Sequence, residues 1–409
     1  MTGTTRTSAG RPQARKWTTG PATLYAGDAG HVLSTLPESS VDCLVTSPPY
    51  FGLRDYGTGG WKRGRRGCPH AAAPSVAAAR RTGTPRTCPD CGAVWVDHQH
   101  GLEPSLADYI DRMVAVFREA RRVLRPTGTL WLNIGDCYAS AETGRNDAER
   151  RYPSFIHGPP PRGARRTGVR TGIPPKNLLG VPWRLALALQ SDGWWLRNAI
   201  VWAKRNPMPE SVTDRLSCTH EMIFLLAPSP RYYFDLDAIR IPLAEPTALA
   251  QRGRIIGGTG KTGRRRVGSA ARRYGATRYG GRGKYDNPDP SLFVSRPPGP
   301  NLLNSRPHRA AHPKGKNPGD VWHLSTKPLK EAHFAAFPID IPLRAIAAGC
   351  PPGGTVLDPF SGAATTGIAA LQLGRQFVGV ELSAEFNRIA KARLLKHLRQ
   401  AGADGKATG

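Results

Sequence analysis

The chain has 409 residues and a formal net charge of +28, with 58 Lys and Arg against 30 Asp and Glu. This length can bury a large core in one domain with insertions or in two domains. The excess of positive charge favours a polyanionic partner, most simply nucleic acid, over a merely solvated basic surface. No apolar run reaches the length of a membrane span, and residues 1–20 are too polar for a secretory signal. Seven cysteines are too few for a disulfide framework in a chain of this length. We therefore expect a cytoplasmic protein.

Apolar periodicity predicts strands and helices along most of the chain. The expected elements are, in chain order, strands at 24–28 and 41–46, a helix at 105–124, a strand at 129–134, a helix at 181–191, strands at 198–204 and 221–226, a helix at 341–348, a strand at 355–359, a helix at 365–373, a strand at 376–381 and a helix at 384–397. Ser105 and Ser383 are the predicted N-caps of the helices that they precede. Pro126 and Gly128 are expected to end the first helix.

Several segments lack this periodicity. They are residues 1–20, which read as a disordered basic arm, residues 58–101 and 141–173, which are rich in Gly, Arg and Pro, and residues 241–318. Within the last segment, residues 251–284 contain eleven Lys or Arg and no Asp or Glu.

Two short motifs follow buried, β-branched runs at opposite ends of the chain. Ser47-Pro48-Pro49-Tyr50 follows the run that ends at Thr46, and Asp358-Pro359-Phe360-Ser361-Gly362-Ala363-Ala364-Thr365-Thr366 follows the run Thr355-Val356-Leu357. Ligands of open α/β sheets bind outside the carboxyl ends of parallel strands. We therefore expect both loops to face one crevice, one holding a cofactor and the other presenting a substrate.

The two motifs resemble those of the amino-group DNA methyltransferases, which use S-adenosylmethionine (AdoMet). Ser-Pro-Pro-Tyr is similar to the catalytic loop of that family, and Asp-Pro-Phe-x-Gly to its cofactor loop, although Ala364 stands where the family usually has Gly. The catalytic loop comes first, as in the circularly permuted beta class. The resemblance implies an α/β fold: a Rossmann-like, circularly permuted methyltransferase sheet with helices on both faces and basic loop insertions.

The resemblance also divides the chain. The expected parts are the arm at 1–20, a catalytic half at 21–57 and 102–240, a Cys/His-containing insertion at 58–101, a basic target-recognition or DNA-binding region at 241–318, an AdoMet-binding half at 319–396 and a tail at 397–409.

An AdoMet site is implied around the second motif. Gly362 lets the backbone approach a ligand closely. Asp358 is expected to meet the cofactor ammonium group directly or through water, and Glu381 to accept the ribose hydroxyls. Thr365 and Thr366 open a helix whose N-terminus favours a carboxylate. The other contacts implied by the family are Asp28 with the adenine amino group and Phe337 and Phe360 beside the cofactor. The alternative is that Asp358 and Glu381 only cap neighbouring helices. A nicotinamide site is disfavoured because no Gly-x-Gly-x-x-Gly follows any of the strands expected above.

The first motif is suited to methylating an exocyclic amine, whose lone pair is delocalised into the base. Ser47 Oγ and the Pro48 carbonyl are expected to accept the two amino hydrogens, the prolines including Pro49 stiffen the loop, and Tyr50 offers a face for a flipped base. The alternative is an ordinary strand-terminating turn. Carbon-5 methylation of cytosine would need a Pro-Cys nucleophile, and the sequence has no such dipeptide.

Cysteine and histidine residues cluster in the insertion. Cys68-Pro69-His70 and Cys88-Pro89-Asp90-Cys91-Gly92 have the spacing of a zinc knuckle with ligands Cys68, His70, Cys88 and Cys91. His98 and His100 are substitute ligands. The alternative is a pair of loops with incidental free cysteines.

The basic segment is the candidate DNA-binding element. Its candidate contacts are Arg264, Arg265, Arg266, Arg272 and Arg273, which would bind phosphates or guanine edges; a solvated linker is the alternative.

The function expected from these observations is site-specific methylation of duplex DNA at N4 of cytosine, which a serine at the head of the tetrapeptide favours over N6 of adenine. The implied cofactors and partners are AdoMet, a possible structural zinc, double-stranded DNA and a possible cognate restriction endonuclease. RNA or protein-glutamine methylation and a non-catalytic DNA-binding module are the remaining alternatives.

Overall fold

The computed structural model describes residues 14–70, 86–139, 172–242, 255–256, 308–309, 314–326 and 337–407. Two compact units are present. The larger comprises residues 1–239 and 318–409, and the smaller residues 240–317. The division of the chain expected from the sequence, including the role of the basic region at 241–318, stays a prediction.

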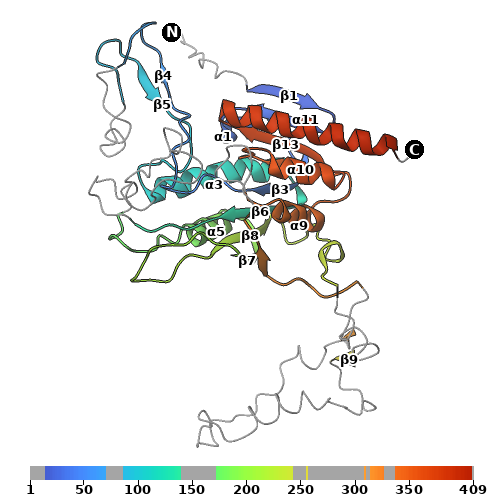
Figure 1. Cartoon of the computed structure of the whole chain (residues 1–409). Helices are drawn as coiled ribbons and strands as arrows, with labels where there is room; N and C mark the ends of the chain where they lie inside the picture. The colour runs from blue at the N-terminus through green and yellow to red at the C-terminus, as the bar shows by residue number, and fades with distance from the viewer. Residues whose placement is uncertain are drawn as a thin grey trace, which may run out of the picture. The chain divides into compact units, whose positions relative to one another are not determined.

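A nine-stranded sheet forms the centre of the larger unit (Figure 1). Its strands are β1 (Arg15–Thr19), β2 (Ala22–Ala26), β3 (Val41–Thr46), β6 (Leu124–Ile134), β7 (Trp195–Lys204), β8 (His220–Ala227), β11 (Val321–Leu324), β12 (Thr355–Asp358) and β13 (Gln376–Glu381). Their order across the sheet is β1-β2-β13-β12-β3-β6-β8-β7-β11. Five neighbouring strands, β2, β13, β12, β3 and β6, are mutually parallel. β1 and β8 are antiparallel to their neighbours, and β11 is parallel to β7.

Helices cover both faces of this sheet. They are α1 (Ala29–Thr35), α3 (Leu106–Val123), α5 (Val181–Ser191), α9 (Asp340–Gly349), α10 (Thr365–Gln372) and α11 (Ala384–Ala407). α1, α3 and α5 contribute to one hydrophobic cluster, and α9, α10 and α11 to a second. The short turn η1 (Asp237–Ile239) follows β8, and two-stranded pairs join β4 (Gly60–Lys62) to β5 (Val94–Val96) and β9 (Ile255–Ile256) to β10 (His308–Arg309).

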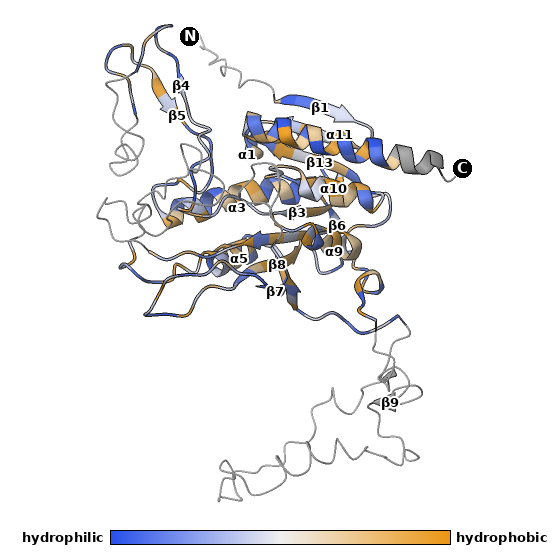
Figure 2. Cartoon of the chain, viewed as in Figure 1, coloured by the Kyte–Doolittle hydropathy of each residue, from blue (hydrophilic) through white to orange (hydrophobic). Residues whose placement is uncertain are grey.

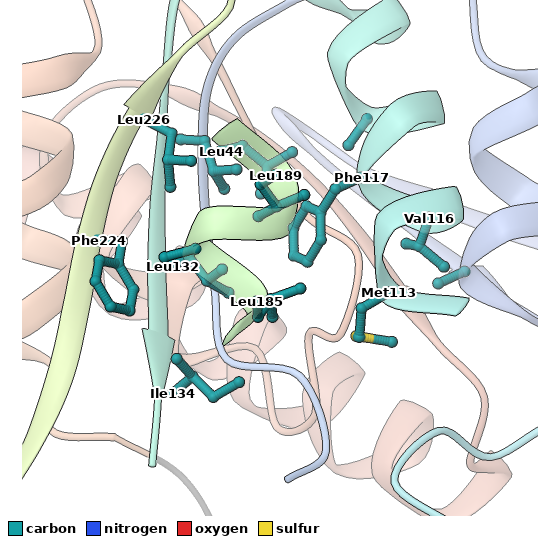
Figure 3. Packing of buried hydrophobic residues seen from close by; sticks show 14 of the residues in the cluster. Leu44, Met113, Val116, Phe117, Leu132, Ile134, Leu185, Leu189, Phe224 and Leu226 are labelled. Carbon is teal, nitrogen blue, oxygen red and sulfur yellow. The ribbon is translucent and has the colours of Figure 1, made fainter. Parts of the chain in front are cut away.

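The central strands supply both cores because successive side chains point to opposite faces. On β6, Leu130 and Leu132 belong to the first cluster and Trp131 to the second. Figure 3 shows Phe117 of α3 and Leu189 of α5 directed toward the strand residues of the first cluster. Figure 2 shows apolar residues along central β8 and polar ones on edge strand β1, in line with their burial.

Most expected elements are present. α5 and β13 have the predicted bounds, and Ser105 accepts the Asp108 N–H as the cap of α3. Residues 15–19, expected within the disordered arm, instead form β1, which pairs with β2. The helix ends before Pro126 and Gly128, as expected. Both residues lie within β6, where a register shift against β3 accommodates them. None of the described helices is long and apolar enough to cross a membrane.

Candidate active site

Polar side chains line one edge of the sheet. β2, β13, β12, β3 and β6 are parallel, so their carboxyl ends meet at the same edge. This places Asp28, Glu381, Asp358, Ser47 and Asn133 in that order beside one another. β8 runs in the opposite direction, so its second residue, Glu221, also lies at this edge. The two sequence motifs therefore lie at the same edge of the sheet.

The cofactor-loop candidate makes a tight turn between β12 and α10. Gly362 has a φ of 49°, and Ala364, at the N-cap position of α10, has a φ of 58°. Both values lie in the left-handed region, where glycine is favoured, so the alanine found in place of the family's glycine adopts the same conformation at some cost in strain. The turn aims the first residues of α10, Thr365 and Thr366, at the sheet edge.

Asp358 connects the two motifs. Its side chain is 2% exposed. Oδ1 accepts hydrogen bonds from Thr46 Oγ1 (2.6 Å) and from the Phe360 backbone N–H (3.1 Å), and Oδ2 accepts one from Thr366 Oγ1 (2.6 Å). Burial raises the pKa of Asp358 to about 6, and these hydrogen bonds oppose that rise. Because Thr46 directly precedes Ser47, the carboxylate fixes the start of one motif against the other.

Glu381 braces the same turn. Oε2 accepts the Gly362 N–H (2.9 Å) and Oε1 the Ser383 N–H (2.7 Å) ahead of α11. Burial, with a smaller contribution from the nearby Asp358, raises the pKa of Glu381 to about 7, and the hydrogen bonds from the Ser383 and Gly362 N–H groups oppose this rise. Glu381 therefore contacts the residue that precedes α11, as the alternative interpretation expected, whereas Asp358 binds the Thr366 hydroxyl rather than a backbone N–H of α10. Carboxylate oxygens have further lone pairs, so the predicted contacts with a ligand stay predictions.

Asp28 lies next to Glu381, because the Gly27 N–H donates to the Glu381 carbonyl (3.0 Å). It caps α1 through a hydrogen bond from the His31 N–H to Oδ1 (2.9 Å). Its Oδ2 is 4.0 Å from His100 Nε2, and the His100 ring meets the Phe360 ring edge to face at 5.5 Å.

The residues around this turn fit a polar ligand. Ser361 Oγ and both ring nitrogens of His100 are buried and have no hydrogen-bond partner among the described residues. Unsatisfied buried polar atoms are costly and call for a partner. Phe360 packs against the first hydrophobic cluster and Phe337 against the second, so the two aromatic candidates approach the site from different faces of the sheet. Residues 327–336, part of the segment that resembles the family, lie outside the described residues.

The loop at Ser47–Tyr50 is held closely on several sides. Tyr109 Oη donates to the Pro49 carbonyl (3.0 Å). A Cβ on Gly101 would lie 2.7 Å from the Tyr50 carbonyl oxygen, and one on Gly135 would lie 2.6 Å from the Tyr50 ring. Glycine is therefore required at both positions for the loop to pack as it does. No hydrogen bond to the Pro48 carbonyl occurs within the described part of the chain.

A directed series of hydrogen bonds leads away from Ser47. Ser47 Oγ donates to Tyr50 Oη (3.3 Å), which donates to Glu221 Oε2 (2.7 Å). Burial raises the pKa of Tyr50 well above its usual value, and Glu221 adds to the rise, so the phenol stays protonated and donates. Lys204 Nζ neutralises the carboxylate from the other side, 2.6 Å from Glu221 Oε1. Asn133 Nδ2 also donates to Glu221 Oε2 (3.2 Å).

Two other groups of predicted residues have different outcomes. Cys68, His70, Cys88 and Cys91 come together, with ligand atoms within 4.8 Å of one another. His98 and His100 are not part of this group, and His100 lies beside Asp28 instead. The DNA-contact candidates Arg264, Arg265, Arg266, Arg272 and Arg273 lie outside the described residues.

Sequence reasoning missed Asn133, Glu221 and Lys204, and it placed His100 among the metal-ligand candidates rather than beside Asp28. Asn133 follows the strand-end rule and could have been found from it. Glu221 could not, because it begins its strand and reaches the edge only through the reversed direction of β8.

Comparisons with known proteins point to one family. A model described as DNA methylase (N6/N4 type) matches residues 41–392. Type II methyltransferase M.Cfr9I of Citrobacter freundii is 35% identical over 373 residues, covering 91% of this chain and 87% of the relative. M.SmaI of Serratia marcescens is 34% identical over 374 residues, covering 91% and 90%. M.SfiI of Streptomyces fimbriatus is 32% identical over 428 residues, covering 89% and 88%.

Proposed function

Because this chain belongs to the N6/N4 family of AdoMet-dependent DNA methyltransferases, we propose that it methylates N4 of cytosine in duplex DNA, with Ser47 and the Pro48 carbonyl as acceptors for the amino group. The observation that carries this proposal is the 2.6 Å hydrogen bond between Thr46 and Asp358, which joins the base-binding loop to the cofactor loop. AdoMet supplies an activated methyl group on its sulfonium sulfur.

Ser47 is suited to accept rather than donate. Its hydroxyl proton already points to Tyr50 Oη, so the Ser47 oxygen presents lone pairs to an incoming N–H. Two acceptors, Ser47 Oγ and the Pro48 carbonyl, match the two hydrogens of an exocyclic amine. Accepting both hydrogens favours a more tetrahedral nitrogen, whose lone pair is less delocalised and more nucleophilic. Both acceptors are fixed before the substrate arrives, which limits reorganisation during the reaction.

The hydrogen bonds from Ser47 through Tyr50 to Glu221 supply a direction for the proton that the amine must lose. Each hydroxyl donates toward the carboxylate, so an additional proton at Ser47 can be passed on toward Glu221. Lys204 Nζ pairs with Oε1 of Glu221, so Oε2 is left to the hydrogen bonds from Tyr50 and Asn133. The Tyr50 hydroxyl is already hydrogen-bonded to Glu221, so only the face of the Tyr50 ring can contact the flipped base. Stacking of the base on this ring stays a prediction.

The predicted DNA substrate accords with the family and with the net charge of +28. We prefer N4 of cytosine over N6 of adenine because the first residue of the tetrapeptide is serine, Ser47. In the family that the sequence resembles, most N6-adenine enzymes have aspartate at this position. The Type II methyltransferases among the relatives support a role in a restriction-modification system with a cognate endonuclease.

Substitution of Ser47 tests the role of the loop. Ser47→Ala should lower the single-turnover rate of methyl transfer by about 10-fold to 1,000-fold, the range for losing one preorganised hydrogen bond to a reacting centre. DNA affinity and AdoMet affinity should change little, because this hydrogen bond matters most as the amine pyramidalises. Ser40→Ala is a matched control, since Ser40 is half-buried outside the site and its hydroxyl donates to the Pro37 carbonyl. An unchanged rate in Ser47→Ala would exclude the proposed role.

A further inference from the structure

The cysteine and histidine residues of the insertion have metal-site geometry. Cys68 Sγ lies 3.7 Å from Cys88 Sγ, and Cys91 Sγ lies 3.6 Å from His70 Nδ1. Two sulfurs bound at about 2.3 Å to one tetrahedral zinc are about 3.8 Å apart, and a sulfur and a nitrogen are slightly closer. A disulfide would place two sulfurs only about 2.0 Å apart. Both distances therefore fit the edges of a coordination tetrahedron and exclude a disulfide between Cys68 and Cys88.

The backbone around the sulfurs is organised for thiolates. The Cys88–Gly92 turn is closed by hydrogen bonds from the Gly92 N–H to the Cys88 carbonyl (2.9 Å) and from the Cys88 N–H to the Ala93 carbonyl (2.7 Å). Backbone N–H groups of Ala93 and Arg65 point to the Cys91 sulfur. Such donors stabilise negative charge on metal-bound sulfur.

Gly64 shows how closely the opposite loop passes. Its φ is 86°, and a Cβ there would lie 2.8 Å from Cys91 Sγ and 2.7 Å from Ala93 Cβ. The loop from β4 and the turn before β5 thus enclose the four ligand atoms from two sides. On the far side, the His70 ring stacks on Trp61 with centroids 4.6 Å apart, which fixes the orientation of the imidazole.

The insertion has little else to hold it together. β4 and β5 have three residues each, and an isolated two-stranded hairpin of this size is at best marginally stable in water. In the described parts of residues 57–97, Cys88 and Ala93 are the only buried hydrophobic side chains. The Arg86 guanidinium lies over the rings of Trp61 and Trp95, which meet edge to face. All three side chains stay partly exposed, and Arg86 Nε and Trp95 Nε1 have no hydrogen-bond partner among the described residues. Metal binding would supply the missing cohesion.

We propose that Cys68, His70, Cys88 and Cys91 bind one structural Zn²⁺ ion that folds the insertion between the catalytic loop and α3. Three thiolates and one imidazole are a ligand set that zinc favours, and four protein ligands leave no position for a reacting water. The site is separate from the methyl-transfer site. The two ends of the insertion are joined to each other, forming a stem, by hydrogen bonds from the Tyr56 N–H to Gln99 Oε1 (2.7 Å) and from the Gly52 N–H to the Gly101 carbonyl (2.8 Å).

Metal analysis of the purified full-length protein tests this inference. The protein and its Cys218→Ser variant should each contain about one zinc per chain; Cys218 is an exposed cysteine outside the cluster and serves as the matched control. Cys88→Ser should lose most of the zinc, whereas His70→Cys should keep it as a four-cysteine site. Calorimetric measurement of AdoMet binding by each variant shows whether that variant is folded.

Cobalt substitution gives a measurement that does not depend on any variant. Co²⁺ added to the metal-free protein should give tetrahedral d–d bands and thiolate-to-cobalt charge transfer of an intensity expected for three sulfurs, and Zn²⁺ should displace both. Absence of these bands would overturn the proposal. So would iron in place of zinc, zinc retained in full by Cys88→Ser, or a Cys68–Cys88 disulfide found by counting free thiols.

Discussion

The hydrogen bond between Thr46 and Asp358 should couple catalysis to the protonation of a buried carboxylate. Thr46→Val removes the hydroxyl that donates to Asp358 Oδ1 but keeps the shape of the side chain. Thr366→Val removes the hydroxyl that donates to Oδ2 at the same distance of 2.6 Å. Both threonines are fully buried, so the two variants are matched in chemistry and environment. Thr46 directly precedes the catalytic loop, whereas Thr366 reaches its strand only through a 3.5 Å contact between Oγ1 and the Val45 carbonyl.

The two variants should have the same effect on Asp358. A hydrogen bond to a charged group is worth about 1.5–3 kcal/mol and one to a neutral group about 0.5–1.5 kcal/mol, so losing it should disfavour the carboxylate by about 1–1.5 kcal/mol. The pKa of Asp358, which is about 6, should therefore rise by roughly one unit in either variant. If the ionised carboxylate attracts the cofactor ammonium group, AdoMet affinity falls as pH drops through this pKa. The fall should begin roughly one pH unit higher in both variants than in the unaltered protein.

The two variants should differ in catalysis. At pH 8.5 and saturating AdoMet, Thr366→Val should transfer methyl groups at close to the normal rate. Thr46→Val should be slower by about 10-fold to 100-fold, because a displacement of Ser47 by a fraction of an ångström disturbs the geometry of attack. Calorimetry across pH measures the first effect and rapid-quench single turnover the second. Thr46→Ser, which keeps the hydroxyl, should restore the rate. Equal rates in the two valine variants at pH 8.5 would refute the coupling of the two loops through Asp358.

Two further predictions concern Glu381 and Glu221. Burial raises the pKa of Glu381 to about 7, so between about pH 4.5 and 7 the native state holds more protons than the unfolded chain, and the free energy of unfolding should decrease as pH rises through this window. Glu381→Gln should flatten that decrease in urea unfolding at pH 5 and pH 7.5; an identical pH dependence in both proteins would contradict the assignment. Glu221→Gln should slow methyl transfer while leaving AdoMet affinity nearly unchanged, because Tyr50 and Lys204 lose their carboxylate partner but the cofactor turn is not in contact with it. Tyr50→Phe should slow transfer by a similar factor, and a normal rate in both variants would exclude the Ser47–Tyr50–Glu221 hydrogen bonds from the reaction.

The sequence was sufficient to predict seven of the nine strands of the central sheet, all except β1 and β11, and the position of both motifs at strand ends. β3 is buried throughout, β13 is largely apolar between Gln376 and Glu381, and each ends at a polar residue. The rule that ligands meet the carboxyl ends of parallel strands therefore brought Ser47, Asp358 and Glu381 to one edge, where the structure has them.

The remaining features depend on contacts between distant segments. β1 lies in a polar arm and forms because β2 offers an edge with which it can pair. Pro126 and Gly128 are usual signs of a break, yet a register shift allows β6 to begin before them. Glu221 joins the site because β8 is antiparallel, and strand direction is not encoded in local periodicity.

Two outcomes changed how the site residues are understood. Asp358 was expected to act chiefly on the cofactor, but both of its oxygens accept hydrogen bonds from buried groups of the protein, so Asp358→Ala would leave two buried hydroxyls unpaired. A clean test therefore needs Asp358→Asn or the threonine variants. His100 follows the cysteines in sequence, and this position makes it a candidate substitute metal ligand. In the structure the Tyr56–Gln99 hydrogen bond closes the stem of the insertion, and the next residue, His100, lies beside Asp28 instead.

The identity of the methylated nucleoside tests the central claim most directly. Purified protein is incubated with genomic DNA from a host without DNA methylation and with AdoMet carrying a deuterated methyl group, and the DNA is digested to nucleosides and separated by mass and retention time. We expect label in N4-methylcytosine, in amounts that fall with Ser47→Ala. Label in N6-methyladenine would contradict the cytosine assignment, and label in 5-methylcytosine would contradict the amine mechanism itself.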